Sequence, residues 1–243
     1  NRVQDNYVVQ WGDATEKKTL PEGLALVPEG DYVAQIGKGL NLKNWMPNFL
    51  AAFPDFAKKF PEVAEKDPKE FEIEMRKRLE STADPYAKGN RNLGGWPISG
   101  NYENGTFWPT HCYGMVGVGR NPSPDTGTGA ELYTVIGHAP RHLDRNIALV
   151  GRVIEGIEHL SSLPRGTGAL GFYETEAERV PIMSVRIGNE AKEVPAFEYL
   201  STESTSFAAY ADARANRRDP FFKVPAGGAD ICNIPVPVRR QGA

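Results

Sequence analysis

Two motifs combine residue types and spacings that proteins use for chemistry. In "HAPRH", His138 and His142 lie four residues apart, a spacing that places two metal ligands on one face of a helix. Pro140 lies between them and disfavours a continuous helix. The sequence holds four histidines in all, and no carboxylate-rich segment accompanies this pair. We therefore expect no metal site here.

The second motif is "GTGALG" at 166–171, which fits the G-x-G-x-x-G pattern of dinucleotide-binding loops. That fingerprint needs a strand before it and a helix after it. Here a predicted helix precedes the glycines, and "FYETEAERVP" leaves little room for a phosphate-binding helix. A glycine-rich helix exit is the better interpretation. Because the glycine motif does not predict a nucleotide site, we expect no cofactor. No Gly-x-Ser-x-Gly elbow occurs, and the carboxylates are too scattered to suggest an acid–base pair.

Two longer segments are more specific when they are taken together. In "NRVQDNYVVQWGD", Arg2 precedes the aromatic Tyr7 by five positions, and Gln10-Trp11-Gly12-Asp13 follows. The second segment, residues 131–160 with the two residues before it, contains four short motifs in the order "GAELY", "LD", "IALV" and "GRVIEG". These motifs, in this order, resemble the signature of cyclophilin-type peptidyl-prolyl cis/trans isomerases. The resemblance covers residues 2–13 and 111–188 and is greatest to the larger bacterial members with an insertion and a tail.

The resemblance implies a reaction without proton transfer or a covalent intermediate. Rotation about an X-Pro bond must cross an amide-resonance barrier of about 18–20 kcal/mol, and it takes tens of seconds or longer without a catalyst. A catalyst must bind the twisted amide better than the planar amide. Two features are sufficient for this catalysis. One is an apolar pocket for the proline ring, and the other is a fixed cation that donates hydrogen bonds to the amide.

The resemblance also implies which residues act. Arg2 matches the catalytic arginine, and its planar, permanently charged guanidinium suits that role better than lysine. The implied substrate-binding residues are Tyr7, Gln10, Gly119, Leu132, Tyr133, His142 and Leu143. The aromatic and leucine side chains would form the proline pocket, and Gln10 would bind the substrate backbone. The alternative is that the aromatic residues are plain barrel core and that Arg2 is a solvated terminal residue.

The sequence departs from the family pattern at several positions. His142 stands where many members carry a tryptophan that contacts cyclosporin, so we expect weak binding of that drug. Glu131 replaces a glutamine, and Arg120 stands where an asparagine is usual. Asn146 and Ile147 occupy the region of a pocket histidine. These changes affect peptide-backbone contacts more than the arginine and its neighbouring aromatic residues.

The elements that must position these residues are mostly short strands. β-forming residues predict strands at 2–10, 113–119, 131–137 and 147–151, and alternation in "RVPIMSVRIG" predicts a half-buried closing strand. Helices are predicted at 154–163 and 204–217. Residues 86–110 are turn-rich. Short strands, few helices and Gly/Pro-rich loops favour a mainly β fold, and the resemblance implies a cyclophilin-like eight-stranded barrel.

The resemblance also suggests a domain organisation. A cyclophilin-like domain would cover 1–188, with an insertion at about 14–110 that is helical around 43–85, and a C-terminal extension would cover 189–243. A cyclophilin barrel needs a strand pair and a helix before the catalytic arginine. Because an incomplete barrel would expose sheet edges, we expect the front of the domain to come from an N-terminal part that precedes this sequence or from another chain. The C-terminal tail is the less favoured source.

Composition limits the partners and the compartment. The net charge is −3, so the basic excess expected of a nucleic-acid-binding protein is absent. No apolar run approaches the roughly 20 residues that span a bilayer. Two cysteines, Cys112 and Cys232, are read as buried free thiols, with a disulfide as the alternative. Exported bacterial relatives favour a periplasmic or secreted location, and the cytoplasm stays an alternative.

Three functions follow from these observations. The first is a prolyl isomerase that acts on proline-containing, unfolded or exported polypeptides. The second is a cyclophilin-like binding module or chaperone with little turnover, which the altered groove residues and the insertion suggest. The third is an assembly subunit that docks through the proline-rich segment "DICNIPVPVRR" near the C-terminus.

Overall fold

The structure is a computed structural model that describes residues 1–35, 70, 73, 82–101, 103–191 and 193–242. It is mainly β with few helices, as predicted. The predicted helical segment around 43–85 falls largely outside the described residues. Two compact units are described separately below. The first unit comprises Asn1–Tyr32, His111–Glu198 and Val238–Ala243, and the second comprises Val33–Thr110 and Tyr199–Pro237.

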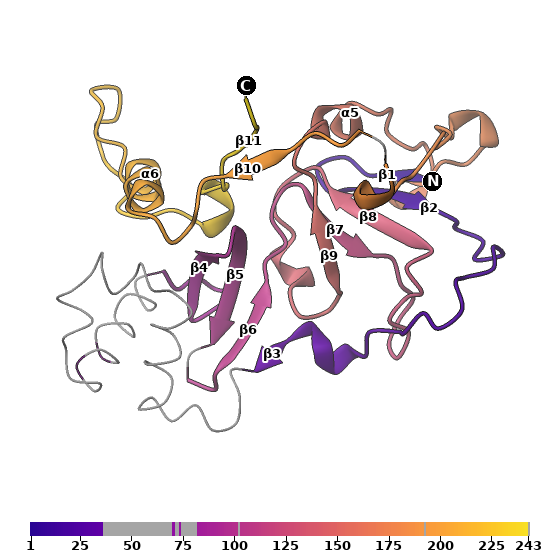
Figure 1. Ribbon diagram of the computed structural model, residues 1–243, viewed down its shortest axis with the longest axis horizontal. Helices are drawn as coiled ribbons and strands as arrows, with labels where there is room; N and C mark the ends of the chain where they lie inside the picture. The colour runs from indigo at the N-terminus through magenta and orange to yellow at the C-terminus, as the bar shows by residue number, and fades with distance from the viewer. Residues whose placement is uncertain (36–69, 71–72, 74–81, 102, 192, 243) are drawn as a thin grey trace. The chain divides into compact units, whose positions relative to one another are not determined.

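A five-stranded antiparallel sheet forms the centre of the first unit (Figure 1). Its strands follow the order β1-β2-β8-β7-β9. Their bounds are β1 (Arg2–Val3), β2 (Val8–Gly12), β7 (Met115–Val118), β8 (Glu131–Val135) and β9 (Leu149–Arg152). β2 and β8 are rich in Val, Trp, Tyr and Thr, residues that favour a pleated, half-buried surface. The strands predicted at 113–119, 131–137 and 147–151 are therefore confirmed, with slightly different bounds. The single strand predicted at 2–10 is wrong, because this segment forms two antiparallel strands, β1 and β2, joined by a turn.

Side chains alternate between the two faces of this sheet, and each face has its own apolar cluster. One cluster contains Val3, Val9, Ile136 and Tyr173, with Trp11, Leu160 and Leu163 packed against it. The opposite face carries Val8, Tyr133 and Val135, with Tyr7, Leu143 and Ile147 partly buried against them. The helix α5 (Ile157–Ser161) supplies Leu160 to the first cluster and is shorter than the predicted 154–163.

A close backbone contact fixes the turn between β1 and β2. Asn6 lies in this turn with φ +50°, and its side chain accepts a hydrogen bond from the His138 backbone N–H at 2.8 Å. The Ile136 N–H donates to the Tyr7 carbonyl at 2.9 Å. A Cβ atom on Gly137 would lie 2.1 Å from the Asn6 carbonyl carbon. Only glycine therefore allows the chain after β8 to approach the turn that carries Tyr7.

Gly137→Ala is accordingly expected to lower the free energy of unfolding by about 1–3 kcal/mol, because backbone must move to relieve the overlap. Urea unfolding measures this effect. Gly151→Ala in β9 is the matched control, since the nearest atom to its added Cβ is 3.9 Å away. The control should leave stability unchanged or slightly raise it. Equal stabilities for the two variants would contradict the close approach at Gly137.

The second unit contains a four-stranded sheet in the order β3-β6-β5-β4. Its strands are β3 (Ala34–Gln35), β4 (Gly89–Leu93), β5 (Trp96–Asn101) and β6 (Thr106–Pro109). The reading of 86–110 as turn-rich was therefore incomplete, because most of this segment is sheet. Polar pairing stabilises it: the buried Ser99 hydroxyl donates to the Asn90 side chain at 2.6 Å and lies 2.7 Å from the Thr110 hydroxyl.

The C-terminal segment adds one helix and a small sheet. The helix α6 (Thr205–Ala215) confirms the prediction at 204–217, and its N-cap Ser204 accepts a hydrogen bond from the Phe207 N–H at 3.0 Å. The strands β10 (Phe197–Tyr199) and β11 (Val238–Arg240) form a two-stranded sheet. The remaining elements are the 3₁₀ helices η1 (Glu29–Tyr32), η2 (Arg141–Leu143), η3 (Ala169–Gly171), η4 (Glu176–Glu178), η5 (Gly188–Glu190) and η6 (Ile231–Asn233).

The described residues do not form the expected closed eight-stranded barrel. They form sheets of five, four and two strands, and β1 and β9 lie at opposite ends of the largest one. The predicted closing strand in "RVPIMSVRIG" is also wrong: residues 179–187 carry no strand, and Met183 is 89% exposed. Alternation of apolar residues indicates a face, but it does not supply a neighbouring strand, and barrel closure needs both end strands to pair.

Candidate functional site

Strand pairing brings Arg2, Gln10 and Tyr133 to one face of the five-stranded sheet. Arg2 of β1 is the register partner of Gln10 in β2, and Gln10 is the partner of Tyr133 in β8. Paired residues in an antiparallel sheet point to the same face, so the three side chains are neighbours. The apolar cluster around Tyr133 lies on this face as well. A cation, an amide and an apolar surface therefore adjoin one another.

The guanidinium of Arg2 is held by three acceptors. Its Nε donates to the Leu170 carbonyl at 2.7 Å, one terminal nitrogen donates to Gln10 Oε1 at 3.3 Å, and the other donates to Gln4 Oε1. The Tyr7 ring centroid lies 5.7 Å from the guanidinium carbon. Partial burial lowers the pKa of Arg2, and Tyr7 opposes this shift. Arginine stays charged in such surroundings.

The Gln10 side chain is oriented by charged neighbours on both sides. Its Nε2 donates to Glu131 Oε2 at 2.9 Å, while its Oε1 accepts from Arg2. Gly119 lies beside this amide: a Cβ there would be 3.4 Å from Gln10 Nε2 and 3.1 Å from Glu131 Cβ. A residue larger than glycine would therefore press on Glu131, the partner of the Gln10 amide, more than on Gln10 itself. Glu131, a departure from the family pattern, fixes which end of the amide faces the arginine.

The apolar part of the site is built from Tyr7, Tyr133, Leu143 and His142. Tyr7 and Leu143 pack against Tyr133. The His142 ring stacks on the Tyr7 ring with centroids 6.1 Å apart and planes 12° apart. Burial raises the pKa of Tyr7, although the nearby Arg2 lowers it in part. The η2 turn, which holds residues 141–143, positions His142 and Leu143 together.

A series of buried, hydrogen-bonded polar side chains holds the Tyr133 hydroxyl in place. The Tyr133 hydroxyl lies 2.8 Å from His111 Nε2, and His111 Nδ1 lies 2.8 Å from Asp144 Oδ1. Arg141 Nε donates to Asp144 Oδ2 at 2.8 Å. Burial raises the pKa of Tyr133 well above its usual value, so its hydroxyl keeps its proton. Because the carboxylate only accepts, the bond between His111 and Asp144 places a proton on His111 Nδ1.

The structure brings seven of the eight predicted site residues together and separates one. Leu132 packs with Tyr32, Val118 and Ala148 in another cluster, because neighbouring residues of a strand point to opposite faces. Sequence reasoning missed Phe172, whose ring lies 5.1 Å from the Arg2 guanidinium carbon. It also missed the link from His111 to Asp144. No sequence signal connects Phe172 to Arg2, which lies 170 positions earlier.

The fold is cyclophilin-like, as comparison with known proteins shows. A family model described as "Cyclophilin type peptidyl-prolyl cis-trans isomerase/CLD" matches residues 1–188, so the chain belongs to that family. The match begins at residue 1 of the given sequence. The crystal structure of cyclophilin AquaCyp293 from Hirschia baltica is similar, with a TM-score of 0.58 and 18% identity over 98% of this chain and 74% of that chain. No curated protein matches the chain.

Two further observations concern the compartment. Cys112 and Cys232 are both disulfide-bonded, so the reading as free thiols was wrong. A disulfide is compatible with an oxidising compartment. Within the part of the chain that the structure describes, no helix has both the length and the apolar character needed to cross a membrane.

Proposed function

We propose that the protein is a peptidyl-prolyl cis/trans isomerase that acts on X-Pro bonds of unfolded or exported polypeptides. One observation carries this proposal: the Arg2 guanidinium is fixed beside an apolar cluster on the same face of the sheet. Family membership supports it. In this proposal residues 1–188, interrupted by the insertion at about 14–110, form the isomerase domain, and 189–243 form an extension.

Arg2 would act on the twisted amide. A guanidinium has five N–H bonds, and three of them donate to Leu170, Gln10 and Gln4 among the described residues. Two remain for the substrate carbonyl and for the prolyl nitrogen. The nitrogen lone pair becomes an acceptor only when the amide loses its planarity. The arginine therefore binds the twisted state better than either planar state, which is the requirement for catalysis.

The apolar side chains would hold the proline ring while Gln10 binds the peptide backbone. The partly buried Tyr7 and Leu143, supported by the buried Tyr133, present a surface from which a bound ring excludes water. His142 extends this surface beside Tyr7, and Gly119 leaves room next to the Gln10 amide. Removal of water strengthens the hydrogen bonds of Arg2, because charges interact more strongly in a low dielectric.

A periplasmic or secreted location would fit the disulfide.

Catalysed isomerisation of a short Ala-Pro-Phe peptide, measured by NMR exchange, tests the proposal. The wild-type protein should shorten the uncatalysed time of tens to hundreds of seconds, and Arg2→Ala should lose most of that acceleration. Arg186→Ala is the matched control, because Arg186 is exposed on the first unit and lies outside the site. Negligible rates for both the wild type and Arg2→Ala would reject the isomerase function.

The second candidate is a peptide-binding module with little turnover. The engagement of Arg2 by three protein acceptors favours it, because a cation that already donates three hydrogen bonds within the protein gains less from the substrate. Suppression of aggregation of an unfolded protein distinguishes the two. Suppression that survives Arg2→Ala, without catalysis by the wild type, would support the binding module. Loss of both activities together would count against it.

A further inference from the structure

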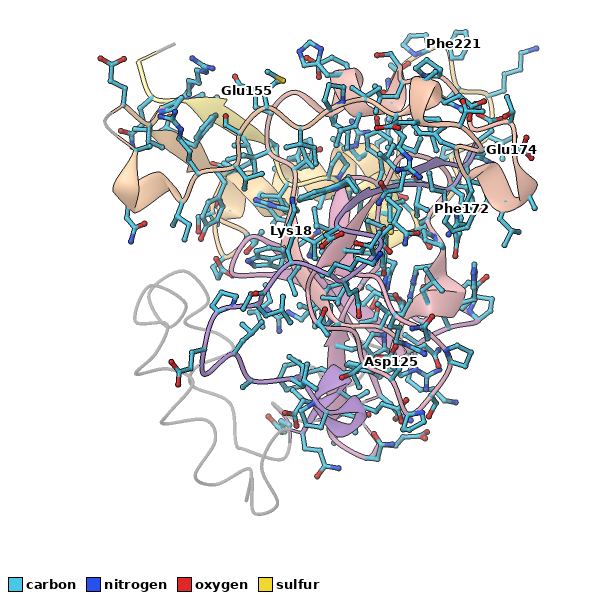
Figure 2. All side chains as sticks on the ribbon, turned by 90° about the vertical axis from the view of Figure 1, so that its right-hand side faces the viewer. Lys18, Asp125, Glu155, Phe172, Glu174 and Phe221 are labelled. Atoms are coloured by element: carbon cyan, nitrogen blue, oxygen red, sulfur yellow. The ribbon has the colours of Figure 1, made fainter. Side chains whose placement is uncertain are left out.

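Two apolar side chains are exposed beside Arg2 on the segment that follows α5. Phe172, labelled in Figure 2, is 40% exposed, and Leu170 is 65% exposed. The Phe172 ring centroid lies 5.1 Å from the guanidinium carbon of Arg2, and the Leu170 carbonyl accepts from Arg2 Nε at 2.7 Å. The Tyr7 ring centroid lies 5.7 Å from the same guanidinium carbon, so both rings adjoin Arg2. We call Leu170 and Phe172 the apolar ridge.

Backbone hydrogen bonds fix the ridge against β1. The Gly166 N–H donates to the Val3 carbonyl at 3.0 Å, and the Tyr173 N–H donates to the Asn1 carbonyl at 2.9 Å. Arg2 and Phe172 form an antiparallel bridge between these two bonds. A Cβ on Gly171 would lie 2.6 Å from the Gln4 Cα, so the two backbones are in direct contact. The ridge is thus attached to the strand that carries the arginine.

The local conformation of the ridge is costly. Leu170 has φ +57° and ψ +19°, the left-handed region, which is unfavourable for a residue with a Cβ. Glycine, asparagine or aspartate would adopt it more easily and would also be better hydrated. Strained backbone in non-glycine residues concentrates at ligand-binding and active sites. An apolar residue that is both strained and exposed next to a cation therefore points to a binding role.

We propose that the apolar ridge is a subsite for a large apolar side chain next to the proline of the substrate. This inference rests on the proposed function, because it places the X-Pro bond at Arg2. Phe172 pairs with Arg2 on the edge of β1 that faces away from β2. Tyr7, whose cluster would receive the proline ring, directly precedes β2. A residue adjacent to that proline would then reach the ridge and cover it. The preferred substrates would be polypeptides with Leu, Ile or Phe beside proline, as exposed in unfolded chains.

Peptides that differ only beside the proline test the proposal. The set is Ala-Leu-Pro-Ala, Ala-Ala-Pro-Leu, Ala-Ala-Pro-Ala and Ala-Glu-Pro-Ala, with kcat/KM measured by NMR exchange and binding measured by chemical-shift titration. The wild type should prefer one of the leucine peptides over the alanine peptide by about tenfold, the size of an apolar-contact effect. Phe172→Ala should reduce this ratio to about 1, and the conservative Phe172→Leu should restore most of it.

The ratio of kcat/KM for the leucine peptide to that for the alanine peptide distinguishes a subsite from a general structural effect. Phe221→Ala is the control, since Phe221 is 84% exposed and lies in the second unit; it should leave the ratio unchanged. A wild type without preference, or a Phe172→Ala variant that is slower on all peptides with the same ratio, would overturn the proposal. Selective binding that depends on Phe172 without catalysis would keep the subsite and reject the isomerase function. Catalysis without such selectivity would reject the subsite alone.

Discussion

Asp144→Ala is expected to lower the free energy of unfolding by about 3–5 kcal/mol, the cost of breaking a buried ion pair by removal of one partner. The Asp144 side chain is 3% exposed and accepts from Arg141 Nε at 2.8 Å and from His111 Nδ1 at 2.8 Å. It also accepts from the His111 backbone N–H at 2.9 Å. The variant would leave a buried guanidinium without its carboxylate. Urea unfolding, followed by tryptophan fluorescence, measures the loss.

A surface ion pair provides the control for this variant. Asp5 pairs with Arg165 at 2.9 Å, but the two side chains are 77% and 41% exposed. Asp5→Ala should therefore change stability by about 1 kcal/mol or less. If Asp144→Ala is no more destabilising than Asp5→Ala, the buried hydrogen bonds and ion pair of Asp144 do not stabilise the fold. Asp144→Ala should also reduce peptide binding, because His111 would lose the partner that orients it toward Tyr133.

Acid titration gives an independent measure of the same carboxylate. Burial alone would raise the pKa of Asp144, but hydrogen bonds from His111 and Arg141 outweigh it, so the pKa lies below its ordinary value. The stabilisation is therefore fully present above the unfolded pKa of about 3.9 and is lost as the pH falls through the lower folded pKa. Below pH 4 the stability of the wild type should fall more steeply than that of Asp144→Asn. Parallel curves would contradict this assignment.

The parts of the site that were predictable from the sequence lie on local, regular structure. Arg2, Tyr7 and Gln10 belong to one strand–turn–strand unit, so their spacing alone places the first and the last on one face. Tyr133 follows from the same alternation once β8 pairs with β2. Leu132 was misplaced because a one-residue shift along a strand changes the face. The family pattern identified the strand β8 as part of the site. Only the pairing register of β8 shows which of its side chains face the site.

The parts that were not predictable depend on contacts between distant segments. Phe172 reaches Arg2 only because the segment after α5 returns along β1. His111 meets Asp144 across 33 positions. In the second unit, β4 and β5 contain Gly, Asn and Pro, which are depleted in strands, and their pairing overrides that propensity. Conversely, 179–187 alternates like a strand and has no strand partner among the described residues.

Arg2→Lys is expected to lower kcat/KM for proline isomerisation by about 100-fold or more, although the charge is retained. The guanidinium contacts acceptors in three directions and lies near the Tyr7 and Phe172 rings. A lysine ammonium has three donors on a flexible stem and no planar fork, so it cannot hold Gln10 and the twisted amide together. Loss of one fixed donor to a developing charge costs about 10²–10³-fold in rate.

The same variant distinguishes a fixed donor from a general electrostatic effect. The loss should appear mainly in kcat, because planar substrate does not yet present the nitrogen lone pair to Arg2. Peptide titration by NMR should show a smaller change in binding, and near-UV circular dichroism should match that of the wild type. Arg186→Lys controls for the substitution itself, since Arg186 is exposed and lies outside the site. A lysine variant with more than a third of the wild-type kcat would show that charge near Tyr7 is sufficient, and that the planar geometry of Arg2 is not what lowers the rotational barrier.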